Sequence, residues 1–245
     1  MGNNYGRVCA MTFQSVADIV YEHAADEENS TDLSFVVSGR LMQQLAVTLR
    51  PGRRLAGWAG SVIAHDNGVI LEDAGNEALV MACNVGDADC RVILSPGGSV
   101  GAFDLKKLAG RILLPQENFL AVGPGVRLRP YSHIKSLKSV DRPDGLVLLQ
   151  ADGEGWVFTA ATGEVSHLKL GPGEILAARG SAIAALGATV VIEKATEAHG
   201  VAADNKLNVA ILRGPGNVWL QSMPAPASAT QPDAKSGSPI VISLS

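Results

Sequence analysis

The feature that most constrains the fold is a strand-like segment that ends on Pro-Gly and recurs along the chain. Apolar residues alternate at Leu168 and Leu170 before Pro172-Gly173, and the same phase precedes Pro51-Gly52 and Pro96-Gly97. Alternation with period two predicts a half-buried strand, and Pro-Gly supplies a fixed φ followed by a residue that can adopt φ > 0. Three strands are therefore predicted to end on one kind of turn.

Two further elements recur in the same order. Gly followed by a polar residue separates strand-like runs at Gly86-Asp87, Gly153-Glu154 and Gly216-Asn217, with Gly39-Arg40 as a weaker fourth copy, and this pattern predicts two-residue hairpins. The pentapeptide Gly60-Ser61-Val62-Ile63-Ala64 returns as Gly180-Ser181-Ala182-Ile183-Ala184, and the middle copy keeps only Asn118-Phe119-Leu120-Ala121. The common order predicts about three β repeats, at 33–72, 79–129 and 146–195, with a closing hairpin at 206–223.

Composition supports a compact β protein. The 245 residues are 47% hydrophobic and 18% charged and include 27 Gly. A chain of this length buries enough surface to fold without a metal or a disulfide. The net charge of −4 gives no global attraction to nucleic acid or to anionic lipid, so nucleic acid is not expected as a partner.

The two ends differ from the predicted β domain at 33–223. Residues 1–32 are predicted to form an extension with one short helix, which packs on its own sheet or on a partner. The residues 224–245 are rich in Pro, Ala, Ser and Gln and predict a flexible tail. Its segment Ile240-Val241-Ile242 either adds to an exposed sheet edge of a neighbouring protomer or stays unstructured. The helix is inferred from apolar residues spaced three and four apart, at Phe13, Val16, Ala17, Val20, Tyr21 and Ala24.

No catalytic, cofactor-binding or metal-binding pattern is present in the sequence. The five histidines are scattered, and there is no nucleophile elbow, Walker loop or dinucleotide fingerprint. Cys83 and Cys90 flank Gly86-Asp87 and would face each other across a hairpin, either as two reduced thiols or as a labile disulfide or half a metal site. The apolar stretch 175–192 is interrupted by Gly180 and Gly187, so buried strands are expected there in place of a transmembrane helix.

One segment carries a local excess of positive charge. It is interpreted either as a solvated linker or as a contact for phosphate or RNA, whose affinity would fall steeply with salt. Its basic residues are Arg127, Arg129, Lys135, Lys138 and Arg142.

The recurring segments resemble a known family. They are LAVTLRPGRRLAGWAGSVIA, ENFLAVGPGVRL, LKLGPGEILAARGSAIA and LRGPGNVWLQS. They look like segments of the TRAP-like proteins grouped as altered inheritance of mitochondria protein 24, a mitochondrial biogenesis family that also has bacterial and archaeal members. The resemblance covers residues from about Phe35 to Met223.

The resemblance implies a fold and a role. The fold is all-β, with β-sandwich or double-stranded β-helix units similar to the tryptophan RNA-binding attenuation protein. The family offers no enzymatic activity and no site residues to carry over, so we expect a non-catalytic scaffold that forms a homo-oligomer or joins a larger complex. That complex would be mitochondrial in a eukaryote, whereas a prokaryotic member would be cytoplasmic and soluble. The alternative is a module that binds a small ligand or RNA.

Overall fold

The computed structural model describes residues 14–15, 33–74, 78–131, 146–195, 197–199, 209–223 and 242–243. Within these residues, the chain forms β-strands and short 3-10 helices, and every strand pair is antiparallel. The prediction of an all-β protein is confirmed.

The predicted N-terminal helix is not supported. Gln14–Ser15 lie inside the predicted helix, but they form strand β1, which pairs with β15 (Val165–Leu170). An open sheet edge satisfies backbone hydrogen-bonding groups, and this tertiary pairing outweighs the local helical pattern at those two positions. The remainder of the predicted helix lies outside the described residues.

Eighteen of the strands form three units with one pairing scheme. In each unit, the sixth strand lies between the first and the third, and the fifth lies between the second and the fourth. The first unit comprises β3 (Gln44–Leu49), β4 (Arg54–Trp58), β5 (Val62–His65), β6 (Val69–Asp73), β7 (Leu79–Asn84) and β8 (Cys90–Leu94). The second comprises β9 (Ser99–Asp104), β10 (Arg111–Pro115), β11 (Phe119–Val122), β12 (Val126–Pro130), β13 (Leu148–Gly153) and β14 (Trp156–Ala161). The third comprises β15, β16 (Ile175–Arg179), β17 (Ile183–Gly187), β18 (Val191–Lys194), β19 (Val209–Arg213) and β20 (Gly216–Gln221).

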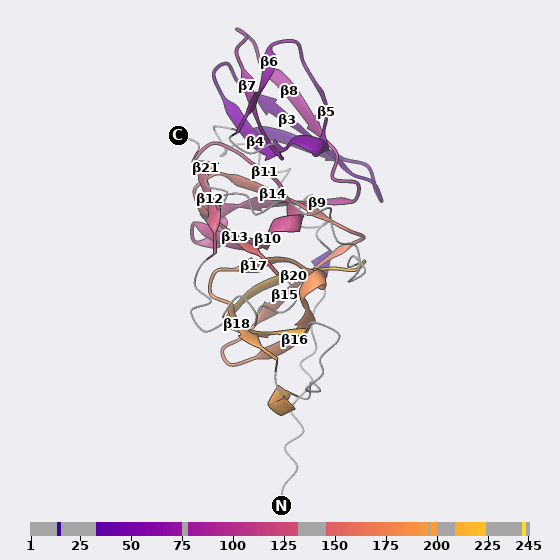
Figure 1. The fold of residues 1–245 in the computed structure, drawn as a ribbon, viewed down its shortest axis with the longest axis vertical. Helices are drawn as coiled ribbons and strands as arrows, with labels where there is room; N and C mark the ends of the chain where they lie inside the picture. The colour runs from indigo at the N-terminus through magenta and orange to yellow at the C-terminus, as the bar shows by residue number, and fades with distance from the viewer. Residues whose placement is uncertain are drawn as a thin grey trace, which may run out of the picture.

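Neighbouring units are joined by strand pairing. The second strand of one unit pairs with the third strand of the next unit, as β4 with β11 and β10 with β17. These two joints produce sheets that run through two units each, in the orders β6-β7-β4-β11-β14-β9 and β12-β13-β10-β17-β20-β15. The units therefore follow one another along the longest axis, with the first unit at the top of Figure 1 and the third towards the bottom.

The two terminal units leave this pattern open. Among the described residues, β5 pairs only with β8, in the sheet β2-β3-β8-β5, where β2 spans Ser34–Ser38. Within the same residues, β16 pairs only with β19, in the sheet β16-β19-β18. β5 is thus the third strand of the first described unit, and β16 is the second strand of the last one.

The hydrophobic core is continuous across the joints. One cluster of buried side chains includes Leu45 of the first unit together with Phe158 of the second. Another includes Leu113 of the second unit together with Ile183 of the third. A central cluster combines residues of all three units, among them Ala56, Leu128 and Trp219. Each unit thus buries part of its apolar surface against its neighbour.

Strand pairing puts the unit boundaries at 44–94, 99–161 and 165–221, out of phase with the predicted repeats 33–72, 79–129 and 146–195 and the closing hairpin 206–223. Pro51-Gly52 and Pro172-Gly173 lie between the first and second strands of their units, whereas Pro96-Gly97 links two units. All three glycines adopt a positive φ, as the turn signal predicts. The Pro-Gly pattern predicts the turn, but it does not predict which strand the next strand pairs with.

The repeated pentapeptide is aligned one residue away from the structural match. A bulge follows Val62 in β5 and Ile183 in β17, so these two residues are equivalent. Ser61 therefore corresponds to Ala182 and not to Ser181. A shift of one residue moves each side chain to the opposite face of the strand. Identical residues in the two pentapeptides therefore do not occupy identical environments.

The Gly-polar turns mostly connect different sheets. β7 and β8 belong to separate sheets, and so do β13 and β14, and β19 and β20. The predicted two-residue hairpins at Gly86-Asp87, Gly153-Glu154 and Gly216-Asn217 are therefore wrong, and so is the closing hairpin at 206–223. Cys83 is opposite Arg54 and Ile70, while Cys90 is opposite Leu49, and both thiols are free. The prediction that these cysteines face each other is therefore also wrong, whereas the free thiols agree with the alternative of two reduced cysteines.

The C-terminal segment adds to a sheet edge of its own chain. Ile242–Ser243 form β21, which pairs with β12 through Arg127↔Ser243 and Leu128↔Ile242. The predicted addition to a sheet edge occurs here within the chain, and residues 224–241 lie outside the described part of the structure.

Candidate functional site

The predicted basic segment divides between β12 and residues outside the described structure. Arg127 and Arg129 alternate on β12 and are exposed. Lys135, Lys138 and Arg142 lie outside the described residues. The structure therefore brings together two of the five predicted basic side chains, and it adds Arg111 of β10, which the sequence reading did not include.

These arginines surround one carboxylate. Asp152 on β13 lies opposite both Arg111 and Arg127 in the sheet. Arg111 Nε donates to Asp152 Oδ1 at 2.6 Å, and Arg129 Nε donates to Asp152 Oδ2 at 3.0 Å. Gln150 Nε2 also donates to the carboxylate, at 2.7 Å. Part of the positive charge of the segment is thus already neutralised inside the cluster.

The pKa of Asp152 reflects opposing effects. Burial raises the pKa of Asp152, whereas the hydrogen bonds from Arg111 and Gln150 and the nearby arginine charges lower it. The lowering effects together are larger, so the pKa of Asp152 lies below its ordinary value. The carboxylate stays ionised at neutral pH and holds two of the arginines. This arrangement is better suited to fixing the strands than to receiving a phosphate.

A cavity of about 440 Å³ opens between the first and second units. Glu117, which lies in the 3-10 helix η3 (Gln116–Asn118), is its one titratable lining side chain. Loss of hydration there raises the pKa of Glu117, although part of the side chain faces water. A single carboxyl group is not a general acid–base pair. The other lining residues are Trp58, Gly60, Ser61, Ser95, Pro96, Gln116, Phe119, Leu120, Val147 and Ala160.

The open strand edges at the two ends of the molecule carry apolar side chains that are buried in the internal copies. Ile63 of β5 is 53% exposed, whereas its equivalents, Leu120 and Ala184, are each 1% exposed. At the other end, Ala177 of β16 is exposed, but its equivalents Ala56 and Leu113 are buried. The same structural position is therefore buried wherever the joint is made and exposed wherever it is not.

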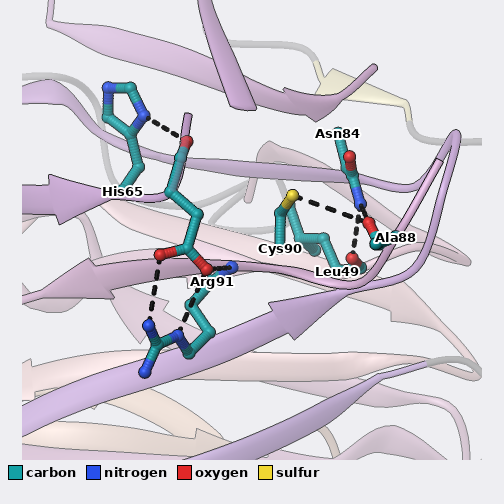
Figure 2. A network of polar contacts seen from close by, with 7 residues as sticks. Leu49, His65, Asn84, Ala88, Cys90 and Arg91 are labelled. Carbon is teal, nitrogen blue, oxygen red and sulfur yellow. Dashed lines mark hydrogen bonds and ion pairs between the residues drawn. The ribbon is translucent and has the colours of Figure 1, made fainter. Parts of the chain in front are cut away.

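The inner side of β5 is held firmly to β8. Asp66, directly after β5, accepts hydrogen bonds from Arg91 N at 2.9 Å and from Arg91 Nε and Nη2 at 3.2 Å each, as drawn in Figure 2. The hydrogen bond from Arg91 lowers the pKa of Asp66. His65 Nδ1 lies 3.0 Å from the Asp66 carbonyl oxygen. These contacts fix the end of β5 while its outer edge stays open.

A buried amide fixes the loop that leads into β8. Asn84 Nδ2 donates to the carbonyl oxygens of Leu49 and Ala88 at 2.7 and 2.8 Å (Figure 2). Its Oδ1 accepts from Gly86 N at 2.9 Å. All three of these hydrogen bonds join the Asn84 side chain to backbone groups. Asn84 is thus a structural residue of the first unit.

Three further features of the described residues concern metal binding, thiol protonation and membrane spanning. Among the described residues, no cluster of three or more His, Cys, Asp or Glu side chains could hold a metal ion. Burial, together with the nearby Glu72, raises the pKa of the Cys83 thiol, which keeps it protonated. Across the described ranges, no helix is both long and apolar enough to cross a membrane.

The sequence reading missed the open edges, although the sequence carries a signal for one of them, that of β5. The third strands read Val-Ile-Ala-His, Phe-Leu-Ala-Val and Ile-Ala-Ala-Leu when aligned on the bulge. His65 thus stands where the internal copies carry Val122 and Leu186. A polar residue at a position that is otherwise apolar marks the copy that lacks a partner within the chain.

Comparisons with known proteins agree on the fold. The family model described as Mitochondrial biogenesis AIM24 matches residues 35–223. The crystal structure of protein SPYM3_0169 from Streptococcus pyogenes is similar, with a TM-score of 0.63 and 15% identity, over 78% of this chain and 94% of that one. A likeness at this identity shows the fold alone. No curated protein matches the chain.

Proposed function

The chain belongs to the mitochondrial biogenesis AIM24 family, and we propose that it acts as a non-catalytic β scaffold, a subunit of a homo-oligomer or of a larger complex. The single observation that carries this proposal is the pair of open edges at β5 and β16, whose internal equivalents join the units. A surface that is buried at each internal joint and exposed at each end is suited to assembly.

The arrangement within each unit supports the finer fold proposal. Two halves of three strands share one core in the first unit, with Leu45 and Val92 from one half and Leu55 and Val69 from the other. This is the organisation expected of a TRAP-like β-sandwich unit that is repeated along the chain. The fold would then supply a rigid body whose ends make the contacts.

The location of the complex follows from the family. In a eukaryotic cell the scaffold would belong to mitochondria, and in a prokaryotic cell to the cytoplasm. Fractionation of source cells tests this, and recovery of the protein mainly in another compartment would contradict it.

The proposal is tested by the native mass of the full chain, purified from its own source, with bound species identified in the same spectrum. A defined oligomer or a stoichiometric protein partner supports the scaffold. A strictly monomeric particle at micromolar concentration, with no partner, would contradict it.

A second candidate function, binding of RNA or a small anionic ligand, rests on Arg111, Arg127 and Arg129, which share one sheet face although Asp152 neutralises part of their charge. Replacing Arg127 and Arg129 by Ala should then weaken binding of single-stranded RNA, with a smaller salt dependence. Lys169→Ala, at an exposed position of β15, is the matched control. Absent or salt-insensitive binding by the unaltered chain would remove this candidate.

A further inference from the structure

We infer that β16 of one copy pairs with β5 of a second copy, so that copies join head to tail through the contact that already joins units within the chain. This inference rests on the proposed scaffold function and names the partner, which is another copy of this chain. It also specifies which residues lie opposite each other.

The register follows from the two internal joints, which are the same. In the first joint, Ala121 is opposite Gly57 and Val122 is opposite Ala56. In the second, Leu186 is opposite Leu113 and Gly187 is opposite Ile112. Each third strand follows a 3-10 helix and contains a bulge after its first residue, and aligning these features makes Val122 and Leu186 equivalent. Both joints therefore have the same register.

Transfer of this register to the open edges pairs His65 with Ala177 of the second copy and Ala64 with Ala178. Ala64 and Ala177 are exposed in the single chain. Both are small, so two backbones can approach to the spacing of paired strands. Ile63 and Ile175, which are 53% and 47% exposed, lie beside these positions and add apolar surface to the contact.

The other sheet edges are less suited to this contact. β2 covers β3, β1 covers β15 and β21 covers β12. Gln43 binds the edge of β9, because Val100 N donates to Gln43 Oε1 at 2.7 Å. β1, β2, β6, β18 and β21 also end their sheets, but no joint between the described units uses a fourth strand or one of the added strands β1, β2 and β21.

The two open edges cannot satisfy each other within one chain. β5 belongs to the first unit and β16 to the third, at opposite ends of the row of units in Figure 1. Pairing between copies is therefore heterologous, so every added copy presents a fresh edge. The product is a ring or an open filament in which the sheets β2-β3-β8-β5 and β16-β19-β18 become one.

The experiment uses two full-length variants that each block one end. Ala177→Arg places a charge on the β16 edge, and Ala64→Arg places one on the β5 edge. Both positions are exposed in the single chain, so circular dichroism should show the normal fold. Each variant alone should lose association by at least about a hundredfold, because an unpaired charge would be buried in the joint.

Mixing the two variants gives the decisive result. Ala177→Arg keeps an intact β5 edge and Ala64→Arg keeps an intact β16 edge, so the mixture should form a one-to-one heterodimer that grows no further. Val191→Arg, on the lateral strand β18 at a 51% exposed position, is the matched control and should assemble like the unaltered chain.

A second measurement tests the register. The double variant His65→Cys with Ala177→Cys should form disulfides between copies under mild oxidation, because directly opposed residues in antiparallel strands have the required separation. The double variant Val36→Cys with Val191→Cys, at two exposed positions outside the joint, should not crosslink.

The outcomes separate this inference from the proposed function. Oligomers that persist in both Arg variants would overturn the head-to-tail joint and leave the scaffold proposal standing. Single variants that are monomeric but form no heterodimer when mixed would also overturn the joint. An unaltered chain that is monomeric without a partner would overturn both.

Discussion

Asn84 is the buried polar residue that most directly ties loops to strands in the first unit. It is 1% exposed and bonds three backbone groups, those of Leu49, Gly86 and Ala88. A buried group that loses its partner bears the full desolvation cost, so removing the amide takes a hydrogen bond from the Leu49 carbonyl oxygen in the interior.

Asn84→Ala is therefore expected to lower the free energy of unfolding by about 2 to 4 kcal/mol, since it removes one buried and two partly buried hydrogen bonds. Urea denaturation followed by circular dichroism measures this. Asp89→Ala, at an exposed position of the same loop, should change stability by less than about 0.5 kcal/mol. Equal changes in the free energy of unfolding for both variants would contradict a stabilising role of the Asn84 amide.

Glu117 makes stability depend on pH. Its pKa is raised in the folded chain, so the folded state holds the proton more tightly than the unfolded state does. The resulting stabilisation is complete below the unfolded pKa and is lost as pH rises through the folded pKa. Glu117→Gln, which cannot ionise, should gain stability relative to the unaltered chain as pH rises from acid to neutral.

The measurement is the difference in urea midpoint between Glu117→Gln and the unaltered chain, taken at several pH values. Glu164→Gln, at an exposed position, provides the comparison for loss of a surface charge. A difference for Glu117→Gln that stays flat with pH, or that falls as pH rises, would contradict the raised pKa.

At the scale of strands, local sequence patterns predicted where strands form and where they end better than they predicted which strands pair. Alternation and Pro-Gly correctly located the ends of β3 and β15, and Gly52 and Gly173 have the positive φ that such turns need. The choice of partner is made by tertiary packing. The step from β7 to β8 changes sheets, although its Gly-polar sequence is that of a hairpin.

The candidate site could be predicted only in part from the sequence, because strand pairing also decides which of its residues meet. Arg127 and Arg129 could be named from a local excess of charge, but Asp152 and Arg111 meet them only because β13 lies between β10 and β12. The open edges of β5 and β16 depend on which strands lack a neighbour. That property belongs to the assembled sheets and cannot be read from either strand alone.

The first joint offers a test of strand pairing. A Cβ added at Gly57 would lie 3.2 Å from the Leu120 carbonyl oxygen and 3.3 Å from a Leu94 methyl carbon. Gly57→Val should therefore separate β4 from β11 and cost about 1 to 3 kcal/mol, the usual range for overpacking. Thermal unfolding followed by circular dichroism measures the loss.

Gly60 provides the matched control for this joint. An added Cβ there meets only Trp58, at an ordinary distance of 3.6 Å. Gly60→Ala is expected to leave stability within about 0.5 kcal/mol of the unaltered chain. A Gly57→Val variant as stable as Gly60→Ala would mean that the joint tolerates the extra bulk.

At the scale of the whole molecule, the shared core makes the three units one cooperative structure. The central cluster contains Ala56, Leu128 and Trp219, one from each unit. A unit that unfolded alone would expose its neighbour's buried face, so interfaces between repeats couple their stabilities.

The tryptophans allow this coupling to be measured, because Trp58, Trp156 and Trp219 lie in the first, second and third units. Variants that keep one tryptophan and carry Phe at the other two should each unfold in one transition. For each variant, the fluorescence midpoint should coincide with its own circular dichroism midpoint. A fluorescence midpoint separated from the circular dichroism midpoint of the same variant would show that its unit melts independently.

The repetition of one joint has a consequence for how the chain reaches its native state. While β4 is still unpaired, β11 of its own chain and β11 of another chain offer it the same contacts. The covalent connection decides between them by holding the correct partner at an effective concentration on the order of millimolar. Refolding of this protein is therefore a competition between tethered and free partners, and crowding unfolded chains together favours exchanged dimers over separate molecules.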